Sequence, residues 1–233
     1  MTKKNFYQTF IHTIEKGKKQ LAVLIDPDIF DNSQSEEFLK NIPKQSTHLF
    51  VGGSTVENGK TEATVSSLKS FSSLPIFLFP GDRSQITEKA DALLFLSLLS
   101  GRNPEYLIGQ QVKAISNLKN TSLEIISMGY ILINGGAESA VSRVSNTLPM
   151  SQENVQAIVD TAKAGEYLGK KLIYLEAGSG AKFPVNKYVI NAVKEAITIP
   201  LLVGGGIKTE NQKQEAFDAG ADMVVMGTVF ENK

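Results

Sequence analysis

Glycines recur where short apolar segments of this chain end, and they are the first residues that could do chemistry. Gly204, Gly205 and Gly206 end one such segment, and Gly227 and Thr228 end the next. Glycine lets the backbone approach a ligand closely and point its N–H groups at an anion. The two segment ends together predict a phosphate site, although glycines at such places also simply make tight turns.

Oxygen-bearing side chains follow two earlier apolar segments. Asp26 lies in the string Asp26-Pro27-Asp28, and Ser54 and Thr55 follow Gly52-Gly53. Mg²⁺ takes oxygen ligands and commonly combines one or two carboxylates with substrate phosphates. Aspartate and serine also cap helices, so each residue alone is a weak sign. We interpret Asp26 as a candidate metal ligand, with a hydroxyl after the second segment as a further oxygen.

A carboxylate ends a third apolar segment, Lys171 to Gly178. Tyr174 and Glu176 share one face of an extended strand because side chains alternate along it. The segment that follows, Gly178 to Gly180, contributes flexible backbone donors. This arrangement predicts a base, Glu176, beside an anion site.

Eight apolar segments alternate with longer amphipathic or polar ones, which is the rhythm of an α/β protein with parallel strands. Their residues are apolar at successive positions, so both faces of each strand should be covered. We therefore expect one domain over residues 1–233, a (β/α)8 TIM barrel. In such barrels the active site lies at the C-terminal ends of the strands and phosphate binds after strands seven and eight. The expected strands are 21–26, 48–53, 75–81, 92–98, 123–133, 171–178, 200–206 and 223–228.

The clearest helices are expected at residues 103–118, 151–168, 186–196 and 211–219. The third crossover, Asp82 to Asp91, is too short for a full helix and should be a loop or a single turn. Only Phe230 to Lys233 follow the last strand, so we expect no full eighth helix. An N-terminal helix at about Phe6 to Gly17 is expected to fill that gap in the outer ring.

Composition restricts the possible functions. The chain has 24 basic and 24 acidic residues, a balance that gives no support for a nucleic-acid or membrane-surface partner. It has no cysteine, which excludes disulfides, thiolate metal sites and a cysteine nucleophile. The longest apolar run, Ala92 to Leu99, is far shorter than a membrane span. We expect a soluble, cytoplasmic protein in which His12 and His48 are structural.

Several strand-end strings, in order and spacing, resemble the geranylgeranylglyceryl phosphate synthase family of archaea, which also has bacterial members. The resemblance runs from Leu24 to Val229 and is carried by LIDPD, VGGST, FPG, FLSLLSGRNPEYLIG, AGEYLGKKLIYLEAGSGA, IPLLVGGGI and GADMVVMGTV. It implies a prenyltransferase that joins geranylgeranyl diphosphate to the 3-hydroxyl of sn-glycerol 1-phosphate, with Mg²⁺ as cofactor. It also implies a homo-oligomer, a dimer or a hexamer.

The resemblance assigns roles to individual residues. Asp26 and Ser54 correspond to the metal ligands, and Glu176 engages the glycerol hydroxyl beside Tyr174. Bacilli-type heptaprenyl enzymes place a lysine two residues before the metal aspartate, where this chain has Leu24. The residues implied to bind glycerol phosphate are Tyr174, Leu175, Glu176, Ala177, Gly178, Ser179, Gly180, Gly204, Gly205, Gly227 and Thr228.

Two alternatives remain open from the residues. One is another phosphate-binding barrel, of the isomerase, aldolase or thiamine-phosphate-synthase kind. Such an enzyme would need a lysine or a second acid at a strand end. Lys182 and Lys208 lie just beyond the strand ends. The other alternative is a non-catalytic barrel that serves as a binding or assembly module.

Overall fold

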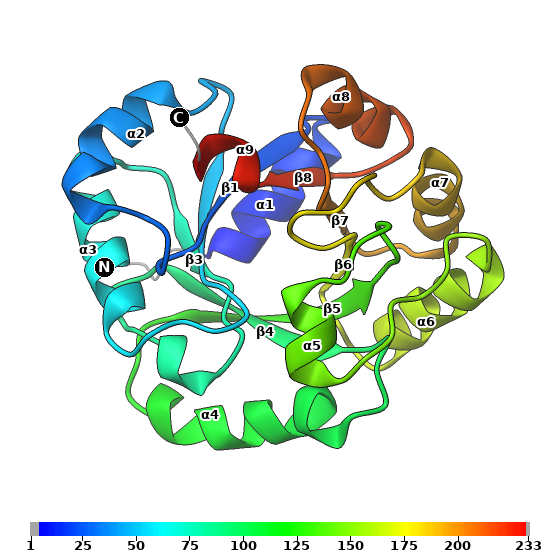
Figure 1. The fold of residues 1–233 in the computed structure, drawn as a ribbon, viewed down its shortest axis with the longest axis horizontal. Helices are drawn as coiled ribbons and strands as arrows, with labels where there is room; N and C mark the ends of the chain where they lie inside the picture. Colours follow the sequence, from blue (N-terminus) through cyan, green and yellow to red (C-terminus); the bar gives the residue numbers. More distant parts are fainter. Residues whose placement is uncertain (1–4, 232–233) are drawn as a thin grey trace.

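Eight parallel strands close into a barrel in the computed structural model, which describes residues 5–231 (Figure 1). Each strand pairs with its neighbours in chain order, and β8 closes the ring by pairing with β1. The expected closed parallel barrel is confirmed. The strands are β1 (Gln20–Ile25), β2 (His48–Val51), β3 (Ile76–Leu78), β4 (Ala92–Leu98), β5 (Glu124–Leu132), β6 (Leu172–Glu176), β7 (Leu201–Gly204) and β8 (Met223–Met226).

The apolar core lies on both faces of the strands, as the unbroken apolar runs indicated. Ala22, Leu94 and Tyr174 belong to the packed interior of the barrel. Their neighbours Val23 and Leu175 point outward, into the layers between strands and helices. Because successive side chains of a strand point to opposite faces, each strand position is assigned either to the interior or to the helical layer.

Helices cover the outside of the barrel (Figure 1). The short third crossover contains only the single turn η2 (Arg83–Gln85), which confirms the expectation for that segment. A π-helical turn, η3 (Glu105–Gly109), runs directly into α4. The other elements are η1 (Asn32–Gln34), α2 (Ser35–Asn41), α3 (Lys60–Phe71), α4 (Gln110–Leu118), α5 (Ala140–Ser145), α6 (Val155–Tyr167), α7 (Lys187–Ala196) and α8 (Glu210–Asp218).

Side-chain caps set the starts of the later helices. Asn186 caps α7 by accepting a hydrogen bond from the Val189 N–H over 2.9 Å. The expected start of α6 at Ser151 is wrong, because Ser151 instead closes a turn with Asn154. Asn154 is the N-cap and accepts from the Ala157 N–H, so the helix begins at Val155.

The N-terminal helix α1 (Phe6–Glu15) forms as expected, but its expected place in the outer ring is wrong. Phe10 is 4% exposed and packs into the barrel interior against the first residues of the strands, including the ring of His48, 5.9 Å away. The Tyr7 N–H donates to Glu124, the first residue of β5, over 3.1 Å. The apolar face of α1 therefore closes the N-terminal end of the barrel, behind the strands in Figure 1.

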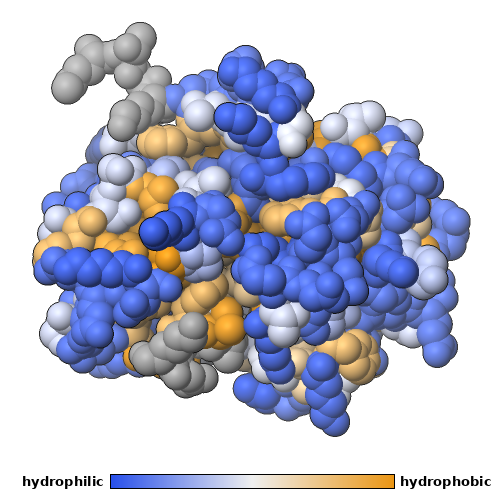
Figure 2. Space-filling model, turned by 90° about the horizontal axis from the view of Figure 1, so that it is seen from above, coloured by the Kyte–Doolittle hydropathy of each residue, from blue (hydrophilic) through white to orange (hydrophobic). Residues whose placement is uncertain are grey.

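The outer surface differs in character between the half that carries α8 and the half that carries α2. Figure 2 shows hydrophilic side chains over the half with α8, and more hydrophobic ones over the half with α2. Phe38 and Leu39 of α2 are only partly buried. After β8, the described chain ends in the short helix α9 (Thr228–Glu231). Within residues 5–231, therefore, no full-length helix follows the last strand, as expected.

Candidate active site

A cavity of about 300 Å³ opens where the C-terminal ends of the strands meet. Its wall contains Asp26 after β1, Ser54 after β2 and Glu176 at the end of β6. Gly205 and Gly227, which follow β7 and β8, belong to the same wall. Parallel strands bring their carboxyl ends to one side of a barrel, so five distant segments share one space.

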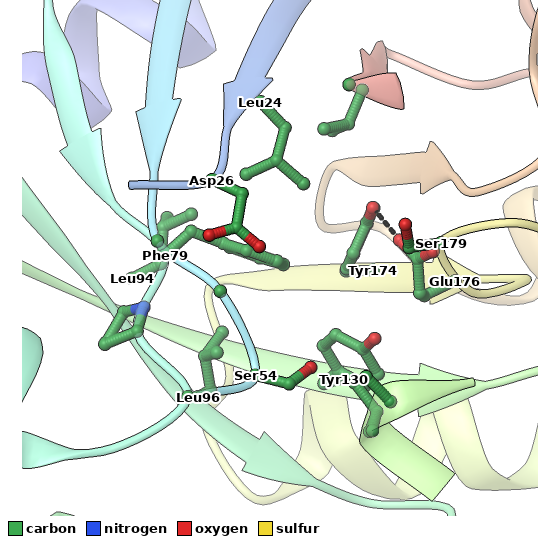
Figure 3. A pocket seen from close by; sticks show the side chains of 18 of the residues that line it. Leu24, Asp26, Ser54, Phe79, Leu94, Leu96, Tyr130, Tyr174, Glu176 and Ser179 are labelled. Atoms are coloured by element: carbon green, nitrogen blue, oxygen red, sulfur yellow. Dashed lines mark hydrogen bonds between the residues drawn. The ribbon is translucent and has the colours of Figure 1, made fainter. Parts of the chain in front are cut away.

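Glu176 is held rigidly at one end of this cavity, with 7% of its surface exposed. The Tyr174 hydroxyl donates a hydrogen bond to its Oε2 (Figure 3), and the Gly178 N–H donates to its Oε1 over 2.7 Å. Burial raises the pKa of Glu176, and the two hydrogen bonds partly oppose that rise because they stabilise the charged form. An oriented carboxylate with a raised pKa is suited to act as a general base.

Tyr174 keeps its proton and acts as a donor. Its side chain is fully buried, and burial followed by the charge of Glu176 raises the pKa of Tyr174 well above its ordinary value. The neutral hydroxyl therefore fixes the orientation of the carboxylate. The sequence prediction that Tyr174 and Glu176 share a face is confirmed.

Glycines form a backbone cradle beside Glu176. Gly205 and Gly206 have φ angles of +77° and +71°, a region that side chains rarely allow. A Cβ at Gly205 would collide with Oε1 of Glu176 and lie 2.5 Å from the Gly178 nitrogen. Within residues 5–231, the N–H groups of Gly205 and Gly206 make no hydrogen bond to another group. These N–H groups are suited to bind an anion such as a phosphate.

Four residues of the expected glycerol-phosphate set lie outside the cavity wall: Leu175, Ala177, Gly178 and Gly204. Strand alternation turns the Leu175 side chain outward into the helical layer, which Ala177 also joins. Gly204 lies within β7, where a Cβ would collide with the Tyr174 hydroxyl. In this structure the four residues support the cavity wall from behind, by packing and through the Gly178 N–H.

The remaining members of that set divide as follows. Ser179 and Gly180 line the cavity beside Glu176. Gly180 has a φ of +76° and open space around it, so ligand can approach its backbone. Thr228 begins α9, and its side chain lies outside the described part of the chain. Gly206, the third residue of the triple-glycine string, also lines the wall, although the glycerol-phosphate set implied by the resemblance contained only Gly204 and Gly205 of that string.

Asp26 and Ser54 line the same cavity as Glu176, and Asp26 lies on the side away from Glu176 (Figure 3). Oδ1 of Asp26 accepts from the Asp28 N–H over 2.9 Å. A Cβ at Gly53 would lie 2.9 Å from Oδ2, so glycine there leaves room beside this oxygen. Burial raises the pKa of Asp26, and the nearby charge of Asp28 adds to the rise.

The residues at this end of the cavity fit a Mg²⁺ ion that is held partly by the protein and partly by the substrate. Among the described residues, no group of three or more histidine, cysteine, aspartate or glutamate side chains could hold a metal ion. A cage made by the protein alone is therefore not what these residues offer. A partly buried carboxylate beside a second negative charge suits a hydrated Mg²⁺ that is also held by substrate phosphates. Asp26 would be its protein ligand, and the Ser54 hydroxyl of the same cavity wall would be a further oxygen.

The other arm of the cavity is apolar. It runs along β4 toward α4 and α5 and is lined by Leu94, Leu96, Leu98, Tyr106, Ala114 and Val141. The Tyr106 hydroxyl donates to the Val144 carbonyl over 2.9 Å and so joins η3 to α5. The short third crossover leaves this flank of the barrel without a full helix. That shortness was the one sequence signal for a groove here.

Two basic side chains, Arg83 and Lys208, lie at the rim of the cavity and are exposed. Lys208 follows the glycine cradle by two residues, which places a positive charge near the anion-binding N–H groups. Its position just beyond a strand end was visible in the sequence, but not its approach to the cavity. Both residues are candidates for attracting phosphorylated substrates.

The fold and this site define a (β/α)8 barrel with an anion cradle, a carboxylate pair across a cavity and an apolar groove. The chain belongs to the PcrB family, whose model matches residues 12–233. It is similar to a geranylgeranylglyceryl phosphate synthase of Zunongwangia profunda, with 54% identity over 93% of this chain and 92% of that one. A protein of the same name from Flavobacterium johnsoniae is 52% identical over 97% of this chain and 93% of its own length.

Solved structures with a similar fold were also found. A (S)-3-O-geranylgeranylglyceryl phosphate synthase from Thermoplasma acidophilum, in complex with its substrate sn-glycerol-1-phosphate, has a TM-score of 0.90 and 32% identity. The alignment covers 99% of this chain and 93% of that one. An N-acetylmannosamine-6-phosphate 2-epimerase from Clostridium perfringens matches with a TM-score of 0.58 at 13% identity over 91% of this chain and 87% of its own, which shows a shared fold alone. No helix within residues 5–231 is long and apolar enough to cross a membrane.

Proposed function

We propose that this protein is a Mg²⁺-dependent prenyltransferase that joins geranylgeranyl diphosphate to the 3-hydroxyl of sn-glycerol 1-phosphate. One observation carries the proposal: a single cavity has a buried, oriented carboxylate at its polar end and an apolar arm at the other. A small phosphorylated alcohol fits the first part and a hydrocarbon chain the second. The names of the curated relatives support the reaction, and the substrate in the Thermoplasma acidophilum complex supports the acceptor.

The acceptor is held by backbone and carboxylate. The phosphate binds to the N–H groups of Gly205 and Gly206, and Lys208 adds positive charge at the rim. The 3-hydroxyl donates to Glu176, whose position is fixed by Tyr174 and Gly178. This arrangement directs the lone pair of the hydroxyl oxygen toward the centre of the cavity.

The reaction replaces one C–O bond by another. The bond between the first prenyl carbon and the diphosphate oxygen breaks, and its electron pair leaves with the diphosphate. The glycerol hydroxyl oxygen forms the new bond to that carbon, and Glu176 takes the proton. General-base assistance of this kind is typically worth 10² to 10⁴ in rate.

Asp26 would hold Mg²⁺, and the Ser54 hydroxyl of the same cavity wall would be a further oxygen. Bound there, the ion would supply positive charge that offsets the negative charge of the diphosphate. Burial and the charge of Asp28 both disfavour an isolated charge on Asp26, so a cation there is stabilising. Assembly into a homo-oligomer and a cytoplasmic location are also proposed, on the family resemblance.

The alternative aldolase-type reading has little support from the geometry. Lys182 is exposed and lies outside the cavity wall, and Lys208 is exposed at its rim. Neither is a buried amine directed at the cavity centre.

The test is incubation with Mg²⁺, sn-glycerol 1-phosphate and radiolabelled geranylgeranyl diphosphate. We expect label in an organic-extractable phosphoether whose ether bond survives phosphatase treatment. sn-Glycerol 3-phosphate and the Glu176→Gln variant are the matched controls and should give far less product. Equal product with both glycerol phosphates, or none with either, would contradict the proposal.

A further inference from the structure

Three aromatic side chains from different strands meet in the cavity: Phe79 just after β3, Tyr130 of β5 and Tyr174 of β6. We call this cluster the aromatic wall. The ring centroids of Phe79 and Tyr130 each lie 5.4 Å from that of Tyr174, with interplanar angles of 85° and 75°. Phe79 and Tyr130 are 6.2 Å apart. Near-perpendicular packing of this kind fixes the orientation of all three rings.

The aromatic wall lies between the two polar groups that define the reaction. In Figure 3, Asp26 is on one side of the three rings and Glu176 is on the other. In the proposed function, the diphosphate departs on the Asp26 side and the acceptor hydroxyl is held on the Glu176 side. The first prenyl carbon must therefore pass between them, against the rings.

The rings stay neutral in this position. Burial, and after it the charge of Glu176, raises the pKa of Tyr130 well above its ordinary value, as it does for Tyr174. The basic side chains of the described cavity wall, Arg83 and Lys208, are exposed, whereas the three rings belong to the packed interior or lie against it. A positive charge that develops at the prenyl carbon thus meets neutral aromatic surface, whose faces carry partial negative charge.

We propose that the aromatic wall, and Tyr130 in particular, stabilises the positive charge that builds on the first prenyl carbon as the diphosphate leaves. The inference rests on the proposed function and adds a group that acts on the reacting carbon. Within the described chain, the Tyr130 hydroxyl makes no hydrogen bond. The position of this side chain is therefore set by the contacts of its ring with Phe79 and Tyr174. A desolvated cation–π contact corresponds to about 30-fold in rate.

The experiment separates ring electronics from packing. Position 130 is occupied in turn by phenylalanine and by its mono-, di- and trifluoro analogues, which are similar in shape but progressively poorer in π-electron density. We expect log kcat to fall steadily along the series, to at least about 10-fold below Tyr130→Phe for the trifluoro variant. The KM for glycerol phosphate should stay within about three-fold, because the acceptor contacts other residues.

Phe77 provides the matched control. Its ring stacks on Phe50 with centroids 5.9 Å apart and lies outside the cavity wall, so the same fluorinated series there should leave kcat unchanged. A flat series at position 130, or equal losses at positions 77 and 130, overturns the inference while the parent still makes product. Absence of product from the parent protein overturns the proposed function and this inference with it.

Discussion

The Tyr174 hydroxyl donates to Oε2 of Glu176, two residues further along β6, and the glycines of the neighbouring strand make that pair possible. Gly204 lies opposite Glu176 in the sheet, and a Cβ there would collide with the Tyr174 hydroxyl. Gly205 leaves the corresponding room for Oε1. The glycine string and the tyrosine-glutamate pair therefore form one structural unit. The absence of side chains at the end of β7 leaves room for the buried glutamate of the neighbouring strand β6.

Glu176→Gln tests the general base. Glutamine keeps the shape and one acceptor oxygen but cannot take a proton, so we expect kcat to fall by at least ~10²-fold. Binding of glycerol phosphate should change less. Steady-state kinetics at saturating Mg²⁺ and donor, with a calorimetric titration of glycerol phosphate, measure the two quantities. Turnover within a few-fold of the parent would make Glu176 a hydrogen-bonding anchor only.

The pH dependence of kcat provides a second test of Glu176. The base is active only when it is deprotonated, so kcat should fall as pH decreases through its pKa. Burial raises that pKa, so the acidic limb should lie above the ordinary value for glutamate. A pH profile of the parent protein at saturating substrates measures it. A limb at or below the ordinary value would contradict the assignment.

Gly205→Ala tests the backbone cradle. Its Cβ would collide with Oε1 of Glu176, so we expect both a higher KM for glycerol phosphate and a lower kcat. Gly169→Ala is the matched control, because Gly169 has a similar φ of +82° but no neighbouring atom within 4 Å. Both variants lose roughly 1–2 kcal/mol of stability to the left-handed backbone. Gly205→Ala loses more, because its Cβ also overlaps the backbone nitrogens of Ala177 and Gly178, and thermal unfolding measures the stability of both variants. Equal kinetics in both variants would remove the cradle assignment.

Asp26→Asn tests the metal site. We expect EDTA to abolish turnover of the parent, and Asp26→Asn to lose most activity with little change in glycerol phosphate binding. Asp160→Asn is the control, because Asp160 is exposed on α6 and lies outside the cavity wall. It should stay within a few-fold of the parent. Full activity in EDTA would refute a Mg²⁺-dependent reaction.

Much of the fold could be predicted because its signals are local. All eight strands lie within apolar runs that end in glycine or a polar residue. Asn186 predicts the start of α7 because it is a residue type that commonly caps helices. The place of α1 could not be predicted, since a helix with one apolar face suits either the outer ring or the open end of the barrel. Only the three-dimensional contact of Phe10 with the interior decides between them.

The polar part of the site was also visible in the sequence, because Asp26 directly follows β1 and Glu176 is the last residue of β6. The apolar arm was not, since Leu94 and Leu96 look like ordinary core residues in a strand. Tyr130 was missed for the same reason. Whether an apolar residue packs against protein or lines a groove depends on what faces it, and a single sequence does not record that.

The length of the donor tests the apolar arm. Burial is worth about 0.8 kcal/mol per CH₂, so one isoprene unit inside the arm changes binding by about 3 to 4 kcal/mol, several hundred-fold. We expect kcat/KM for geranylgeranyl diphosphate to exceed that for farnesyl diphosphate by this order. Competition between the two labelled donors measures the ratio directly. Equal values for farnesyl, geranylgeranyl and heptaprenyl donors would show that the tail leaves the protein.

The last prediction concerns the contribution of His48 to the stability of the folded protein. His48 lies at the opposite end of the barrel from the cavity. It is 6% exposed among Phe10, Phe50 and Phe77, and burial lowers its pKa to about 4. Above the unfolded-state pKa of about 6.5 the ring is neutral in both states and contributes no pH dependence. As pH falls from there toward 4, the unfolded state binds a proton that the folded state does not, so the folded state loses stability. The loss from this one group reaches about 3 kcal/mol, from 1.36 kcal/mol per unit of pKa difference.

His48→Gln isolates that contribution, because glutamine cannot take up the proton and can still bond to the Thr47 hydroxyl, which lies 2.9 Å from Nδ1 in the parent. We expect the variant to be less stable than the parent at pH 7, since it loses the ring contacts. The difference between the two should then shrink steadily below pH 6.5, because only the parent loses the histidine contribution. Urea unfolding of both proteins at several pH values between 7 and 4 measures it. A difference that stays constant over this range would mean that His48 is protonated in the folded protein as readily as in the unfolded chain.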